Sequence, residues 1–173
     1  NQDKKINLFE IDDNNNSKVN SNYINHQSLK LKDSEVVIDD IQFSSLSDSN
    51  LVNIVDAGGG NDTKLVLQKL KEIDLSGLNY YIPINDDMEQ VDNVKDTIAL
   101  IRDFDKSANI NLVLNRCFSL EKDEIKKQFI NIFGDDELDI PNQLDNLKVD
   151  NVFFIPNSNI FSILKSHYKV SLL

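Results

Sequence analysis

Several residue types are scarce in this chain, and each scarcity excludes a class of structure. The single cysteine, Cys117, cannot form an internal disulfide, which fits a reducing compartment. No run of about 20 apolar residues occurs, so we expect no membrane-spanning helix. Lys and Arg number 18 against 29 Asp and Glu, which gives a net charge of −11. Because such a surface repels nucleic acid, we expect partners that are proteins rather than DNA. The single cysteine leads us to expect a cytoplasmic location.

Glycine is also scarce: only five occur in 173 residues, and three of them are consecutive. These three follow the apolar run 51–55 and Asp56, and they precede an expected helix over residues 63–74. Glycines let the backbone turn tightly and approach a ligand closely, and ligands of open α/β sheets bind beyond the carboxyl ends of the strands. The pattern predicts a buried strand that carries Asp56 to a ligand-facing edge, with Asp62 or Thr63 capping the helix.

Apolar runs alternate with amphipathic segments along the rest of the chain. This alternation predicts one three-layer α/β domain over residues 1–173, with a mainly parallel sheet between helices. Polar residues 13–27 are expected to form a mobile loop, and His26 and His167 are expected at the surface. The remaining expected strands cover residues 6–11, 29–31 (a short edge strand), 80–84, 110–114 and 152–155. The remaining expected helices cover 91–104, 121–133 and 156–166.

The order of these strand-end signals resembles the ParA/MinD group of deviant Walker ATPases, which move plasmids, chromosomes and protein complexes. KINLFEIDDNNNS is similar to the strand that leads into the family's first switch, and IVDAGGG is similar to its Walker B strand and second switch. IPINDD, LVLNR and FFIPNSNIFSILKSHYKVSLL resemble, in order, the next strand, the strand that frames the adenine and the closing segment. The resemblance covers nearly the whole chain and implies a P-loop NTPase-like fold.

The resemblance assigns one group of residues to the phosphates of ATP. It implies that Asp12 orients the attacking water and that Asp56 binds Mg²⁺ through water. Gly58 and Gly59 would direct backbone N–H groups towards the terminal phosphate.

A second group would hold the base: Asn115 would recognise the adenine, Arg116 would stack on it, and Pro156 would lie against it. The implied function is a nucleotide-dependent switch in plasmid partition or maintenance, or in conjugative transfer. Such a switch forms a homodimer and acts on a protein partner or cargo.

One family motif is missing, because the chain contains no G-x-x-x-x-G-K-[ST] phosphate loop. In the family this loop comes before the first switch, and its strand pairs beside the Walker B strand. We therefore expect these residues to be a fragment of a longer ATPase domain and to be inactive alone. We also expect the open edge of the 51–55 strand to pair with another copy or with the missing segment.

Two alternatives remain open. A non-enzymatic scaffold with a degenerate nucleotide site would accommodate the missing loop. A receiver-like phosphoacceptor domain would use Asp12, Asp13 and Asp56 as its acidic triad. A receiver needs a helix directly after the acidic pair and a lysine at the end of a late strand, whereas this chain has NNNSKVNSN and Asn115-Arg116 at those places.

Overall fold

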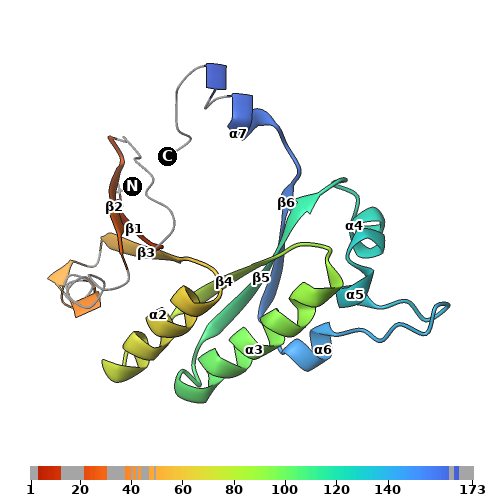
Figure 1. The fold of residues 1–173 in the computed structure, drawn as a ribbon, viewed down its shortest axis with the longest axis horizontal. Helices are drawn as coiled ribbons and strands as arrows, with labels where there is room; N and C mark the ends of the chain where they lie inside the picture. The colour runs from red at the N-terminus through yellow and green to blue at the C-terminus, as the bar shows by residue number, and fades with distance from the viewer. Residues whose placement is uncertain are drawn as a thin grey trace. The chain divides into compact units, whose positions relative to one another are not determined.

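The fold is α/β, and the strands that the structure describes all pair in parallel (Figure 1). A computed structural model describes residues 4–12, 22–30, 38–39, 41, 43, 47–48, 50–163 and 166–167. The chain divides into two compact units, Asn1–Leu75 with Ile160–Leu173, and Ser76–Asn159. The predicted α/β class and parallel pairing are confirmed, although the described strands form two three-stranded sheets rather than one.

The first unit contains a sheet in the order β2-β1-β3, with a helix after the last strand. Its described elements are β1 (Lys5–Ile11), β2 (Ile24–Leu29), β3 (Leu51–Ala57), α2 (Asn61–Glu72) and α7 (Ile160–Ile163). The central strand β1 contributes the buried side chains of Phe9 and Ile11, and Phe9 packs against Ile41. The apolar run of β1 therefore forms the core of this sheet, as its sequence predicts.

Three sequence predictions for the first unit are wrong. Strand β2 lies partly within the expected loop 13–27, because its sequence INHQSL has too few apolar residues to stand out as a strand. Residues 13–21 of that loop lie outside the described residues. Helix α2 begins after Gly60, earlier than expected, and no side chain caps it. The predicted burial of β3 is also not found, since Ile54 is 45% exposed and no residue of the strand is fully buried.

A row of asparagines crosses the first sheet at one level. Asn7 of β1 stands opposite Asn25 of β2 and Asn53 of β3. The side-chain amide of Asn25 donates to Asn7 at 3.2 Å, and that of Asn7 donates to Asn53 at 2.9 Å. The three strands are thus joined by side-chain as well as backbone hydrogen bonds.

The second unit contains a sheet in the order β4-β5-β6. Its elements are β4 (Asn79–Ile84), α3 (Met88–Phe104), β5 (Asn109–Cys117), α4 (Lys122–Gln128), α5 (Ile130–Phe133), α6 (Leu144–Leu147) and β6 (Asn151–Pro156). The central strand β5 is the most buried, with Ile110 and Leu112 fully covered. The predicted apolar stripe of α3 is buried at Val91, Val94, Ile98 and Ile101.

The expected helix over residues 121–133 is broken into α4 and α5 at Phe129, whose side chain is buried. Gly134 ends the second piece with a φ of 76°, in the left-handed region that favours glycine. Asparagines also stand opposite each other in this sheet: the side-chain amide of Asn151 in β6 donates to the side-chain oxygen of Asn111 in β5 at 2.9 Å.

Each sheet has two edge strands among the described residues. Within the described residues, β3 pairs only with β1, and β4 pairs only with β5. Pro83 lies in β4, as expected for an edge strand, because proline has no N–H to donate.

Candidate functional site

The sequence-predicted residues Asp12 and Asp56 lie at the same edge of the first sheet. Strands β1 and β3 run in parallel, with Glu10 opposite Asp56 and Ile11 opposite Ala57. Asp12 directly follows β1, and its N–H donates to the carbonyl of Leu29 at 3.2 Å. Both carboxylates therefore stand at the carboxyl ends of neighbouring strands, where the sequence places them.

Two acidic side chains approach Gly58 closely. A Cβ at this position would lie 2.8 Å from Asp62 Oδ2 and 3.1 Å from Asp12 Cγ. Its N–H donates to the carbonyl of Ile11 at 2.8 Å, and its carbonyl accepts from the Thr63 hydroxyl at 2.6 Å. The glycine thus fixes the start of the loop between Asp12 and the first turn of α2.

The other two glycines differ from Gly58 in what they provide. A Cβ on Gly59 would meet nothing within 4 Å, so the backbone there faces open space. Gly60 has a φ of 66° and stands at the N-terminal end of α2. Since the Gly58 N–H is already bonded to Ile11, Gly59 is the better placed of the two predicted phosphate ligands.

Three carboxylates concentrate negative charge at this edge. Partial burial, together with the charges of Glu10 and Asp12, raises the pKa of Asp56. A cation beside Asp56 would relieve this repulsion. Within the described part of the chain, no three His, Cys, Asp or Glu side chains are grouped closely enough to hold a metal ion. A Mg²⁺ ion here would need water and phosphate oxygens as further ligands, which is its usual mode of binding with nucleotides.

A histidine adjoins this cluster, contrary to the expectation that it lies at the surface. The His26 side chain is 5% exposed, and its Nε2 lies 3.5 Å from Oε2 of Glu10. The neighbouring Ser28 stands opposite Glu10, and its hydroxyl is buried without a hydrogen-bond partner among the described residues. Sequence reasoning missed this group because His26 and Ser28 lie in β2, which has few apolar residues, and because Glu10 lies inside β1 rather than at its end. The other histidine, His167, is exposed as expected.

The remaining predicted residues gather at the carboxyl edge of the second sheet. Asn115 and Arg116 lie in an irregular stretch of β5, where the pairing with β6 shifts register between Leu114 and Cys117. Arg116 has a φ of 60°, a strained value for a residue with a side chain. Pro156 ends β6 opposite Cys117, and the next residue donates its N–H to the Cys117 carbonyl at 2.7 Å.

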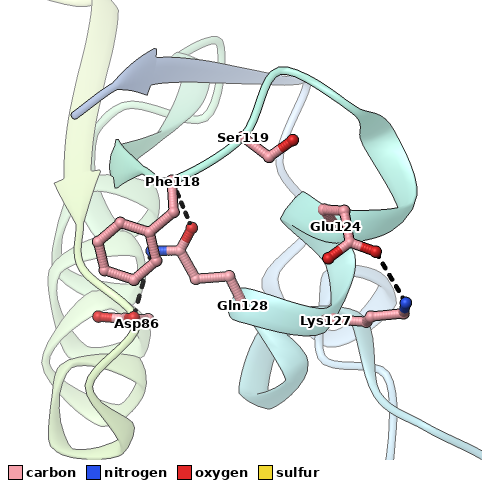
Figure 2. Close-up of a pocket in the computed structure, with 6 residues that line it drawn as sticks. All are labelled: Asp86, Phe118, Ser119, Glu124, Lys127 and Gln128. Carbon is pink, nitrogen blue, oxygen red and sulfur yellow. Dashed lines mark hydrogen bonds and ion pairs between the residues drawn. The ribbon is translucent and has the colours of Figure 1, made fainter. Parts of the chain in front are cut away.

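A cavity of about 410 Å³ opens at this edge of the second sheet (Figure 2). The Gln128 side chain of α4 connects three segments that border this cavity. Its amide oxygen accepts from the Phe118 N–H at 2.9 Å. Its amide nitrogen donates to the Asp86 carboxylate at 3.2 Å and to the Arg116 carbonyl at 3.1 Å. Six residues line the cavity: Asp86, Phe118, Ser119, Glu124, Lys127 and Gln128.

The Phe118 ring is 74% exposed and lies on the same side of the cavity as Asp86 (Figure 2). An exposed aromatic face can stack on the planar ring of a ligand, and a carboxylate beside it can accept hydrogen bonds from amino groups on that ring. Nothing in the sequence indicates a role for Phe118 or Gln128, because each is a single residue without a motif. Cys117 is buried as expected, and its burial raises the pKa of the thiol, which disfavours the thiolate form that a nucleophile needs.

Comparisons of the chain with protein-family models, curated proteins and solved structures find no match. Among the described residues, no helix has the length and apolar character that a membrane span requires.

Proposed function

We propose that this chain carries the switch regions and base-binding edge of a nucleotide-dependent ATPase of the ParA/MinD type. Its role would be in plasmid partition or maintenance, or in conjugative transfer. The observation that carries the proposal is the pairing of β1 with β3, which brings Asp12, Asp56 and Gly58 to one edge while the second edge of β3 has no strand among the described residues. In the family that the sequence resembles, the phosphate-loop strand pairs beside the Walker B strand, which corresponds to β3.

The residues of the first unit would act on the phosphates. Asp56 would hold Mg²⁺ through water, and the repulsion from Glu10 and Asp12 that raises its pKa would favour a bound cation. Asp12 would orient the attacking water, and the open backbone at Gly59 would accept the terminal phosphate. The bound ion would neutralise the charge that develops on the transferred phosphoryl group.

The residues of the second unit would hold the base. Asn115 and Arg116 in β5 and Pro156 in β6 share one sheet edge, next to the cavity beneath Phe118. The net charge of −11 favours a protein partner or cargo over direct contact with DNA. In this proposal, nucleotide binding would drive formation of a homodimer.

The proposal requires a phosphate loop from outside these 173 residues, since none occurs within them. We therefore expect the 173-residue chain alone to show no low-micromolar binding of Mg-ATP in calorimetric titration and no hydrolysis. Low-micromolar binding would mean that other residues replace the loop.

The decisive test uses a gene product that includes such a loop. The Asp56→Ala variant should lose ATP hydrolysis, whereas Asp12→Ala should slow hydrolysis and keep nucleotide binding. Asp96→Ala, which changes an exposed carboxylate on α3, serves as the matched control and should leave turnover unchanged. Normal turnover in Asp56→Ala would contradict the assigned site and would favour a scaffold with a degenerate nucleotide site.

A further inference from the structure

The second unit has a basic groove on an otherwise acidic chain. The groove lies between α3 and α6, has a volume of about 370 Å³ and is bordered by Lys95, Arg102, Lys106 and Lys148. Four of the 18 basic residues in the sequence therefore border one small depression. Such a local concentration of positive charge attracts a segment of opposite charge.

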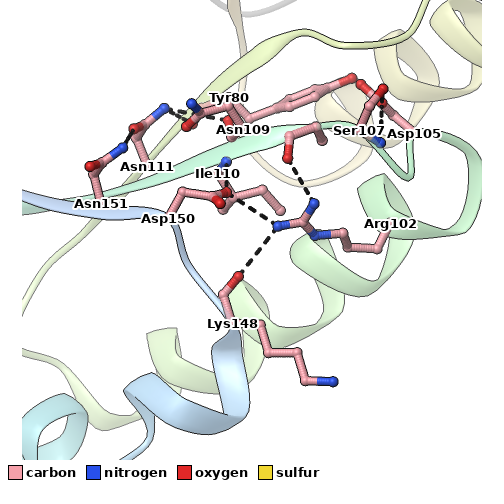
Figure 3. A network of polar contacts seen from close by, with 11 residues as sticks. Tyr80, Arg102, Asp105, Ser107, Asn109, Ile110, Asn111, Lys148, Asp150 and Asn151 are labelled. Atoms are coloured by element: carbon pink, nitrogen blue, oxygen red, sulfur yellow. Dashed lines mark hydrogen bonds and ion pairs between the residues drawn. The ribbon is translucent and has the colours of Figure 1, made fainter.

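Arg102 lines this groove, and Figure 3 shows the polar contacts that hold it in place. Its guanidinium donates to the Ala108 carbonyl at 2.7 Å, to the Lys148 carbonyl at 3.4 Å and to the Asp150 carboxylate at 3.2 Å. Asp150 in turn accepts from the Ile110 N–H at 2.7 Å. The end of α3, the end of α6 and strand β5 are thus held together, and the groove is formed before any partner arrives.

Two lysines of the groove have no acidic partner in the described part of the chain. The Lys106 ammonium donates to the Arg102 carbonyl at 2.6 Å, and the Lys148 ammonium forms no hydrogen bond there. Figure 3 shows the Lys148 side chain running away from Arg102. Lys95, in contrast, is paired with Asp92 at 3.1 Å. Lys106 and Lys148 are therefore the cations available to an incoming acidic group.

The floor of the groove is apolar. Ile98 of α3 and Leu147 of α6 line it, and they are 6% and 2% exposed. An apolar floor between cations suits an aliphatic side chain flanked by carboxylates. A nucleic-acid backbone, which is recognised through its phosphates, has no need of such a floor.

The same unit presents a segment of this kind on the loop between α5 and α6. Asp135 and Ile140 form a pair of backbone hydrogen bonds of 2.8 and 2.9 Å, and the Asp135 carboxylate accepts the N–H groups of Glu137 and Leu138. Leu138 is 64% exposed between Glu137 and Asp139. The loop projects from its unit (Figure 1), and its internal bonds hold it in one shape, which lowers the entropic cost of docking.

We propose that the loop Asp135–Ile140 of one copy docks into the α3–α6 groove of a second copy. Leu138 would pack onto the apolar floor of the groove, while the carboxylates of Asp136 and Glu137 would meet Lys106 and Lys148. Because the two surfaces differ, the contact is heterologous and joins copies head to tail. It needs no nucleotide, so it is separate from the homodimer of the proposed function.

The test is sedimentation velocity of the 173-residue chain without nucleotide over a range of concentrations. The wild type should associate. The groove variant Lys106→Glu/Lys148→Glu and the loop variant Asp136→Lys/Glu137→Lys should each associate about tenfold more weakly or not at all, because attraction becomes repulsion. An equimolar mixture of the two variants should regain association, since each groove again meets a loop of opposite charge.

The matched control is Lys122→Glu/Lys126→Glu, which reverses two exposed charges on α4 and should associate like the wild type. Circular dichroism checks that each variant is folded. A monomeric wild type overturns the proposal, and so does association that persists in both charge-reversal variants or is not restored on mixing. Duplex DNA that binds the wild type but not the groove variant would assign the groove to nucleic acid instead.

Discussion

Removing the buried carboxylate of Asp105 should destabilise the second unit more than any exposed charge change. Asp105 follows α3, is fully buried and accepts four hydrogen bonds. The donors are the N–H of Gly77 at 2.9 Å, the N–H of Leu78 at 3.2 Å, and the N–H and hydroxyl of Ser107 at 3.1 and 3.0 Å. One side chain therefore joins the end of α3 to the segment that enters β4.

The size of the effect follows from these contacts. A hydrogen bond to a charged acceptor contributes about 1.5–3 kcal/mol, and a buried donor left without a partner costs about 1–3 kcal/mol. Gly77 is exposed, so in the variant its N–H can form a hydrogen bond to water. This lowers the expected loss of stability. We expect Asp105→Ala to lower the free energy of unfolding by about 2–4 kcal/mol. Asp105→Asn, which keeps one acceptor oxygen, should lose roughly half as much.

Guanidinium denaturation followed by circular dichroism measures this loss, and hydrogen exchange at the Gly77 and Leu78 amides localises it. Asp96→Ala is the control for loss of a negative charge from α3. A loss below about 0.5 kcal/mol for Asp105→Ala, equal to that of the control, would refute the reasoning.

The stability contributed by Asp105 should also depend on pH. Burial by itself raises the pKa of this carboxyl, but the hydrogen bonds from Gly77, Leu78 and Ser107 outweigh it, and the pKa is lowered overall. A group with a lowered folded-state pKa contributes its full stabilisation above its unfolded pKa, about 3.9 for Asp, and loses it as the pH falls through the folded value. Asp105→Asn should therefore differ from the wild type at pH 7 and converge with it in acid.

Three further outcomes are expected. Asp56→Asn should stabilise the protein at neutral pH, because burial and the charges of Glu10 and Asp12 raise the pKa of Asp56, and its ionised form opposes folding above the unfolded pKa. Denaturation at several pH values checks this, and a gain that does not grow as the pH rises from about 3 would contradict it. Gly58→Ala should lower stability by about 1–3 kcal/mol, since the added Cβ meets two acidic side chains; thermal melts equal to the wild type would show that they move aside. Tyr80→Phe should be neutral or stabilising by up to about 1 kcal/mol, because the Tyr80 hydroxyl is buried without a partner among the described residues. A clear loss of stability in that variant would reveal an ordered water or another partner.

The sequence predicts most elements of the fold because their apolar periodicity is strong. The runs over residues 6–11, 80–84, 110–114 and 152–155 are all strands, and the stripe of α3 is buried as its spacing indicates. Strand β2 is different, since its polar residues are matched by Asn7 and Glu10 of β1. Polar pairing between strands depends on tertiary contacts and leaves no periodic apolar signal in a single sequence.

The candidate site is predictable in the same partial way. Asp12 and Asp56 are found together because each ends an apolar strand, and parallel pairing brings such ends to one edge. Gln128 could not be found, because its hydrogen bonds reach residues 10 to 42 positions away. Likewise, nothing near Asp105 in the sequence indicates that it bonds to residues 27 and 28 positions earlier.

The row of Asn25, Asn7 and Asn53 has a consequence for how the first sheet assembles. If β3 slipped by one residue, Val52 or Ile54 would stand opposite Asn7, and an amide would lose its partner to a hydrocarbon side chain. The asparagine hydrogen bonds therefore stabilise the native register of the three strands relative to registers shifted by one residue. Three strands from distant parts of the chain are thus held in the register that places Asp56 opposite Glu10 at the edge of the sheet.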